Sequence, residues 1–400
     1  MTEDPRLTTG QQPRLNPGAG RRALGGFFLS GLLFSFLGPI LPAWGYHLHS
    51  DYSTVALYFL FLTFGIYAGA HTCQWLAPRT GLRVMLIAGS ALGCAALIAL
   101  AFASGPVPPS YRMFGLFAVG AAGAIVNTAV FHAITPLYEH DPASTINLSG
   151  ALFGFGCLSA TLLTVLTFNT YEVSSMLLLF AVVPFYFLIS YIRGGEFVFI
   201  AQELPSLKEA LQDFKSPGAI LFTLLLFFQF GNEWAIASWL PLFLIQRLGV
   251  SPASALYLLA TYWTALVAGR VVAQALLPRY KHSKILMGSV IAAMLGCVLL
   301  SLTEKMGGAV VGIALIGCGF ASIYPLVTES IEHRFPYYHP GFYGGIFSLG
   351  LTGALLTPSL LGAIAAQWGV GKVMLLPALG AMMVAVLVLL IWLEARLTKS

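Results

Sequence analysis

The sequence predicts an all-α membrane protein with twelve transmembrane helices in two pseudo-symmetric six-helix bundles. Its 400 residues are 58% hydrophobic and only 9% charged, whereas an ordinary soluble domain is about 25% charged. So few charges cannot cover a water-exposed surface. Long apolar runs recur along the chain, and the second half repeats short stretches of the first. The runs give the number of helices, and the repeat gives the symmetry.

Twelve stretches are apolar and long enough to cross a bilayer core, which takes about 20 helical residues. The connections between them are mostly short, and one near the middle of the chain is long. The predicted spans are residues 23–46, 53–76, 82–104, 112–138, 145–168, 174–192, 218–245, 254–277, 284–303, 307–331, 341–367 and 372–393.

These spans divide the chain into four parts. Residues 1–20 are polar and rich in Pro and Gly, so they are predicted to form a disordered tail and not a signal peptide. Residues 21–194 and 217–396 form the two bundles, with a connector at 195–216. Within this connector, Ser206 and Glu209 have the spacing of a capping box, which predicts a short helix there.

The charges indicate the direction of the chain in the membrane. If the N-terminus lies inside, 15 of the 20 Lys and Arg residues fall in cytoplasmic segments, four fall in outer loops and Arg270 lies within a span. The positive-inside rule then places both termini in the cytoplasm of a multi-pass protein, expected in a bacterial inner membrane. The basic residues form no patch, so a nucleic-acid partner is not expected. The five cysteines lie inside apolar runs, which favours neither disulfides nor a metal site.

An internal repeat relates the two halves. The run QWLAPR at 74–79 recurs as QALLPR at 274–279, in each case at the inner end of the second helix of the half. The first helix of each half shares Leu-Leu-Phe followed by Gly, at 32–38 and again at 225–231. Each half is therefore predicted to hold six helices.

Two six-helix repeats with a charged inner loop after the second helix resemble the major facilitator superfamily. The run LAPRTGLR at 76–83 resembles that family's inner-loop motif, with Pro78 where the motif has Asp. The stretches 147–156 and 231–241, together with Trp263 and Gly269-Arg270, resemble the fucose and glucose permease branch. This resemblance implies a sugar:proton symporter with a central cavity. Unlike fucose-type symporters, this chain has no acidic residue in its first helix.

The seventh predicted helix carries the polar groups that could bind a solute. At about 100° per residue, Gln229, Asn232, Glu233 and Trp239 share roughly a third of the helix circumference. A carboxylate in lipid is costly, so Glu233 is expected to face a cavity or a partner. It could carry the coupling proton or accept hydrogen bonds from the solute, while the structural alternative is a protonated glutamate that joins two helices. The amides suit hydroxyl groups and the indole offers a flat apolar face.

Two further residues complete the predicted substrate site. Asn127 lies beside a groove of small residues in the fourth predicted helix, where it could line the cavity or pack against a neighbouring helix. Its counterpart in the second half is Tyr324, a hydroxyl donor directly before Pro325.

A second set of charges is expected to form a cytoplasmic gate. Arg270 and Glu329 have similar depth in their helices, and buried charges of opposite sign tend to pair. The rest of the predicted charge network comprises Glu139, Arg79 and Arg83 in the first half and Arg279 and Glu332 in the second.

These residues favour a secondary transporter that moves a small polar, sugar-like solute by alternating access, coupled to protons or sodium. It is expected to work as a monomer in the lipid bilayer without a cofactor, since no Gly-rich nucleotide loop is present. The aromatic richness suits an alternative, proton-driven efflux of amphipathic compounds. A sensor or scaffold on the same fold is a third reading. An enzyme is not expected, because Glu233 has no second catalytic group at its depth.

Overall fold

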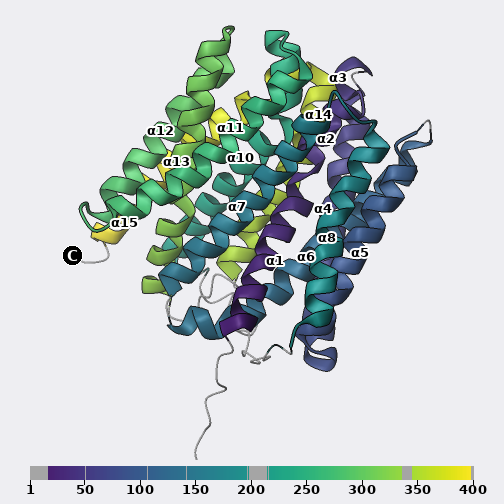
Figure 1. The fold of residues 1–400 in the computed structure, drawn as a ribbon. Helices are drawn as coiled ribbons and strands as arrows, with labels where there is room; N and C mark the ends of the chain where they lie inside the picture. The colour runs from purple at the N-terminus through teal and green to yellow at the C-terminus, as the bar shows by residue number, and fades with distance from the viewer. Residues whose placement is uncertain are drawn as a thin grey trace, which may run out of the picture.

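The computed structural model describes residues 17–397 apart from 50, 106, 141, 196, 198–213, 215 and 336–344. Long helices run side by side and form one bundle (Figure 1). They are α1 (Pro17–Ser35), α2 (Leu37–Ala43), α3 (Tyr46–His49), α4 (Tyr52–Thr80), α5 (Leu82–Phe102), α6 (Pro109–His140), α7 (Pro142–Thr167), α8 (Val173–Arg193), α10 (Pro217–Leu248), α11 (Pro252–Leu276), α12 (His282–Leu302), α13 (Met306–Arg334), α14 (Gly345–Trp368) and α15 (Leu375–Leu397), with the 3-10 turn η1 (Val370–Lys372) before the last helix.

The described residues contain twelve membrane spans, as predicted, when one bent pair is counted as a single span. Eleven helices are each long and apolar enough to cross a membrane, and the twelfth span is the pair α1 and α2, which meet at an angle of 42°. The sequence predicted one continuous helix at 23–46. The helix breaks at Phe36, just before Pro39 and Pro42, whose missing N–H groups weaken the backbone ladder there. The capping box of Ser206 and Glu209, where a short helix was predicted to begin, and the tail at 1–16 lie outside the described residues.

Close glycine contacts hold the helices of each half together, and corresponding pairs pack alike. In the first half α1 packs on α7, and in the second half α10 packs on α14. A methyl group on Gly31 would meet the backbone of Phe153, and one on Gly353 would meet the backbone of Phe227. Lipid gives no hydrophobic drive for helices to associate, so such close backbone approach supplies the van der Waals contact instead.

The two halves meet differently at the two ends of the bundle. We call the end where α1 begins and α8 ends the connector end, and the end where α2 and α3 lie the far end (Figure 1). At the far end α2 crosses α10 so closely that a methyl on Gly38 would meet the backbone of Ala237 and Ser238. Nearer the middle, Thr63 on α4 donates to the carbonyl oxygen of Leu355 on α14 at 2.7 Å.

A partly buried ion pair clamps the second half at the connector end. The Arg334 guanidinium on α13 forms two hydrogen bonds with the Glu394 carboxylate on α15, one of them with an Nη1–Oε2 distance of 2.7 Å. The guanidinium lies against Gly218 in the first turn of α10, where a methyl would meet it. The pair therefore ties three helices together.

We expect Arg334→Ala to lower stability by about 2 kcal/mol, because it removes the charge-assisted hydrogen bonds to the partly buried Glu394 carboxylate. Thermal unfolding of the protein in detergent would measure the loss. The control is Arg247→Ala, which breaks an exposed ion pair with Glu304 at the far end and should cost less than about 1 kcal/mol. Equal losses for the two variants would contradict a clamp.

Candidate functional site

A cavity of about 240 Å³ lies between the two halves. Its wall is mainly apolar and includes nine aromatic side chains, which is typical of pockets that bind small molecules. The aromatic side chains are Phe27, Phe34, Phe59, Phe131 and Phe153 from the first half and Phe230, Trp234, Tyr324 and Phe347 from the second.

The cavity is closed towards the far end and extends towards the connector end. Its far-end wall includes Ser238 and Pro358, beside the place where α2 crosses α10. In the other direction it reaches Ile134 near the end of α6 and Thr145 near the start of α7. At the connector end the halves still touch through α7 and α11, where Asn147 donates to Gln274 at 2.6 Å.

One face of α10 supplies much of the second-half wall. Its cavity-lining residues are Phe230, Glu233, Trp234 and Ser238. Their spacing of three to four residues places them on one side of the helix. The cavity-facing side of α10 includes Glu233 but not Asn232. The predicted face included both residues, so it was turned too far towards Asn232. The spacing of Phe230 and Trp234 is the signal in the sequence that marks the cavity-facing side of α10.

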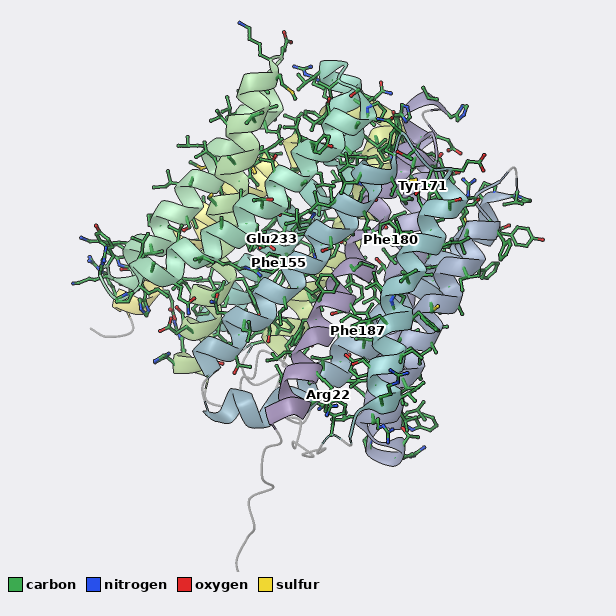
Figure 2. The ribbon with its side chains drawn as sticks, in the orientation of Figure 1. Arg22, Phe155, Tyr171, Phe180, Phe187 and Glu233 are labelled. Carbon is green, nitrogen blue, oxygen red and sulfur yellow. The ribbon has the colours of Figure 1, made fainter. Side chains whose placement is uncertain are left out.

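Glu233 is the central charged group of this cavity. Among the carboxylates that the structure describes, it alone lines the wall. The amide of Gln229 donates to Glu233 Oε1 at 2.7 Å from one helical turn away. The Tyr262 hydroxyl on α11 lies 3.4 Å from the Glu233 carbonyl oxygen. Figure 2 places Glu233 near mid-height of the bundle, far from either end.

Arg270 brings the opposite charge to the same cavity. It lies on α11 and lines the wall together with Glu233. Its Nη1 donates to the carbonyl oxygen of Gly150 on α7, which belongs to the other half. The expected partner Glu329 is elsewhere: its carboxylate lies 3.1 Å from Nδ1 of His282 on α12. The predicted Arg270–Glu329 pair is therefore absent from the structure described here, because α13 directs Glu329 outwards.

Asn127 and Tyr324 both line the cavity, from α6 and α13. The Ser30 hydroxyl donates to Asn127 Oδ1 at 3.2 Å, which orients the amide. The Tyr324 ring packs against Phe230 and Phe347, with centroid distances of 5.3 and 6.2 Å. Each residue thus presents a polar group in an otherwise apolar wall.

Three of the predicted substrate residues lie behind the cavity wall. Gln229 is fully buried and reaches the site only through its bond to Glu233. Asn232 is buried and faces α15, where a methyl on Gly380 would meet its amide. Trp239 is fully buried at the far end, and its indole N–H donates to the Pro358 carbonyl oxygen at 2.9 Å. The structure therefore gives Asn232 and Trp239 a packing role.

The other predicted gate charges are dispersed. Arg79 lies over the Trp75 ring at 4.3 Å on the outer surface of α4. Arg83 donates to the carbonyl oxygens of Tyr191 and Ile192 at the end of α8, which satisfies part of that helix terminus. Arg279 is exposed after the end of α11, and Glu332 is half-buried near the end of α13. The side chain of Glu139 lies outside the described residues.

The sequence matches known proteins over most of its length. The profile of the Major Facilitator Superfamily matches residues 23–352. The chain belongs to this superfamily. A relative named Protein TsgA homolog, from Buchnera aphidicola subsp. Baizongia pistaciae, is 21% identical over 383 residues, which is 94% of each chain. A putative glucose/galactose transporter from Helicobacter pylori is 27% identical over 173 residues, which is 41% of this chain and 40% of that one. The chain is thus a membrane transporter and not an enzyme.

Solved structures share the fold. The D-xylose–proton symporter superposes with a TM-score of 0.72 at 13% identity, over 93% of this chain and 96% of that chain. FucP in the outward conformation gives a TM-score of 0.62 at 16% identity, over 93% and 98%. At such identities the likeness concerns the fold alone.

We expect Trp239→Phe to leave solute affinity unchanged, because Trp239 does not line the cavity. The change should lower stability by about 1 kcal/mol, since it removes the hydrogen bond to Pro358. Solute binding by calorimetry and thermal unfolding in detergent measure the two effects. A large loss of solute affinity at unchanged stability would instead indicate that Trp239 belongs to the substrate site.

Proposed function

We propose that this transporter moves a small neutral, sugar-like solute together with a proton, and that Glu233 carries the proton. The observation that carries this proposal is the position of Glu233, a carboxylate at mid-height on the wall of an aromatic cavity between the halves. Ionisable groups inside membranes are costly and are functional by default. A carboxylic acid there can take up a proton from one side and release it to the other as access alternates.

The wall chemistry supports a ring-shaped solute with hydroxyl groups. Phe230, Tyr324 and Phe347 form a contiguous aromatic surface, which suits the C–H face of a sugar ring. Asn127, the Tyr324 hydroxyl and Glu233 offer donors and acceptors on both sides of the cavity. The names of relatives agree with this class, since a glucose/galactose transporter and fucose and xylose symporters are among them.

The direction of the cavity supports alternating access. The far end is closed where α2 crosses α10, and the cavity extends towards the connector end. The excess of Lys and Arg favours a cytoplasmic position for that end and for both termini. We therefore place the protein in a bacterial inner membrane, as a monomer in the lipid bilayer, facing inwards in this state.

The aromatic wall also supports a second candidate, proton-driven export of an amphipathic compound. Nine aromatic residues surround few polar groups, a composition that also suits a flat apolar molecule. Transport assays in vesicles of known orientation distinguish import from export, because they show whether the compound accumulates inside or is lost. Sugar uptake driven by an inward proton gradient favours the first candidate, and gradient-driven loss of a hydrophobic dye favours the second.

We expect Glu233→Gln to abolish proton-driven accumulation while solute exchange continues, because glutamine resembles the protonated acid but cannot release a proton. Proteoliposomes with and without a pH gradient, tested with labelled hexoses, pentoses and nucleosides, measure both activities. If Glu233 only binds the solute, exchange will weaken and coupling will remain.

The matched control is Glu329→Gln, the same change at a carboxylate that pairs with His282 away from the cavity. It should accumulate solute like the parent. If Glu233→Gln accumulated solute with the same pH dependence as the parent, Glu233 would have only a structural role.

A further inference from the structure

A small side pocket lies next to the main cavity, between α7, α10 and α11. Its volume is about 30 Å³, and four of its lining residues also line the main cavity. Two of these shared residues are Phe153 and Trp234, whose rings meet edge to face with centroids 6.5 Å apart. The residues that line the side pocket but not the main cavity are Gly154, Trp263 and Leu266. The side pocket is therefore within reach of a substituent on a solute that is held in the main cavity.

Two side chains of the side pocket carry N–H donors that lack acceptors. Nε1 of Trp263 and Nε of Arg270 are buried and have no hydrogen-bond partner among the described groups. An indole has only this one polar atom. The guanidinium is held in place because its Nη1 donates to the carbonyl oxygen of Gly150. Buried donors are normally paired with protein, water or ligand, so these two donors favour an acceptor oxygen in the side pocket.

The side pocket also offers an acceptor, the carboxyl group of Glu233. Gln229 donates to its Oε1 at 2.7 Å, which leaves Oε2 for a second donor. A hydroxyl group has one hydrogen to donate and two lone pairs that accept. It therefore matches the two N–H donors and the one acceptor oxygen. A protonated Glu233 keeps acceptor capacity, so this match does not depend on the charge of Glu233.

The volume of the side pocket suits a hydroxymethyl group. One water molecule needs about 10–15 Å³, so a space of about 30 Å³ holds about two non-hydrogen atoms. A hydroxymethyl group has two such atoms, one carbon and one oxygen. The apolar side chains of Phe153 and Leu266 suit the carbon, and the unpaired donors suit the oxygen. A hydroxyl group attached directly to the sugar ring would fill only half of this space.

We infer that the side pocket binds the exocyclic hydroxymethyl group of a hexose, and that Trp263 is a specificity-determining residue. The sugar ring lies in the main cavity, and the hydroxymethyl group extends past Phe153 and Trp234. Its oxygen accepts hydrogen bonds from Trp263 and Arg270, and its hydrogen is donated to Glu233. The inference rests on the proposed sugar substrate and narrows it, because pentoses and 6-deoxy sugars lack the group that the side pocket binds.

Sugars that differ by one oxygen atom test the inference in the unmodified protein. Calorimetry of the full-length protein in lipid nanodiscs would compare D-glucose with 6-deoxy-D-glucose, and D-galactose with 6-deoxy-D-galactose. We expect the 6-deoxy sugar to bind at least about 10-fold more weakly, because its methyl group leaves both buried donors unpaired. D-Xylose, which lacks the whole substituent, should also bind more weakly than D-glucose.

Trp263→Phe tests the donor, since it removes the indole N–H and keeps an aromatic ring. This variant should bind the hexose about 5-fold more weakly than the parent, because one hydrogen bond is lost. It should bind the 6-deoxy sugar as well as the parent does. The matched control is Trp239→Phe, the same change at a tryptophan whose N–H is already paired with the Pro358 carbonyl oxygen outside the cavity. The control should keep the parental preference for the hexose.

A second variant tests the space instead of the donor. Leu266→Phe enlarges a side chain that lines the side pocket but not the main cavity. It should weaken binding of D-glucose and leave binding of D-xylose unchanged, because only the hexose places a group in the side pocket. This variant decides the matter if Trp263→Phe does not fold.

The outcomes separate this inference from the proposed function. Equal affinities for a hexose and its 6-deoxy form in the unmodified protein overturn the hydroxymethyl site, as expected if the side pocket holds only water, and leave sugar transport intact. A parental preference in Trp263→Phe overturns the role of Trp263, and parental binding of D-glucose by Leu266→Phe overturns the site. If the unmodified protein neither binds nor transports any of these sugars, the proposed function itself is wrong, and the inference falls with it.

Discussion

The high cost of charge in a lipid-surrounded bundle is the constraint on which the central part of this structure depends. Glu233 and Arg270 can both stay inside membrane-spanning helices only because each faces the internal cavity and has polar neighbours. Gln229 holds the carboxylate and the Gly150 carbonyl holds the guanidinium. Glu233 and Gln229 belong to α10, Arg270 to α11 and Gly150 to α7, so the site exists only when these three helices are packed together.

Glycine residues allow the helices to pack closely enough for these contacts to form. The same absence of a side chain that lets α1 approach α7 at Gly31 lets Arg270 reach the backbone at Gly150. Across the halves, contacts join pairs of helices such as α4 with α14, α7 with α11 and α2 with α10. Movement between the halves then requires the loss of a few specific contacts at each end, such as the crossing of α2 over α10.

Much of the fold could be predicted from hydropathy and spacing. The spans agree with the helices to within a few residues, apart from the break at Phe36, where prolines act inside an otherwise continuous apolar run. Glu233 was predicted as a carboxylate that needs a cavity or a partner, Asn127 as an amide beside a groove of small residues, and Tyr324 as its counterpart in the second half. All three line the cavity. A polar group buried in the membrane needs a hydrogen-bonding partner or a cavity. This requirement can be applied to the sequence without knowledge of any tertiary contact.

Only the tertiary structure determined the rotation of each helix about its axis and which charged groups come into contact. Asn232 lies next to Glu233 in sequence yet faces Gly380, because α15 and the cavity occupy opposite sides of α10. Arg270 and Glu329 have matching depth, but depth does not give direction, and Arg270 instead reaches a backbone carbonyl of the other half. The sequence by itself determined the number of spans, the repeat and the lone carboxylate. The rotation of the helices, which depends on contacts between residues far apart in the chain, determined the site.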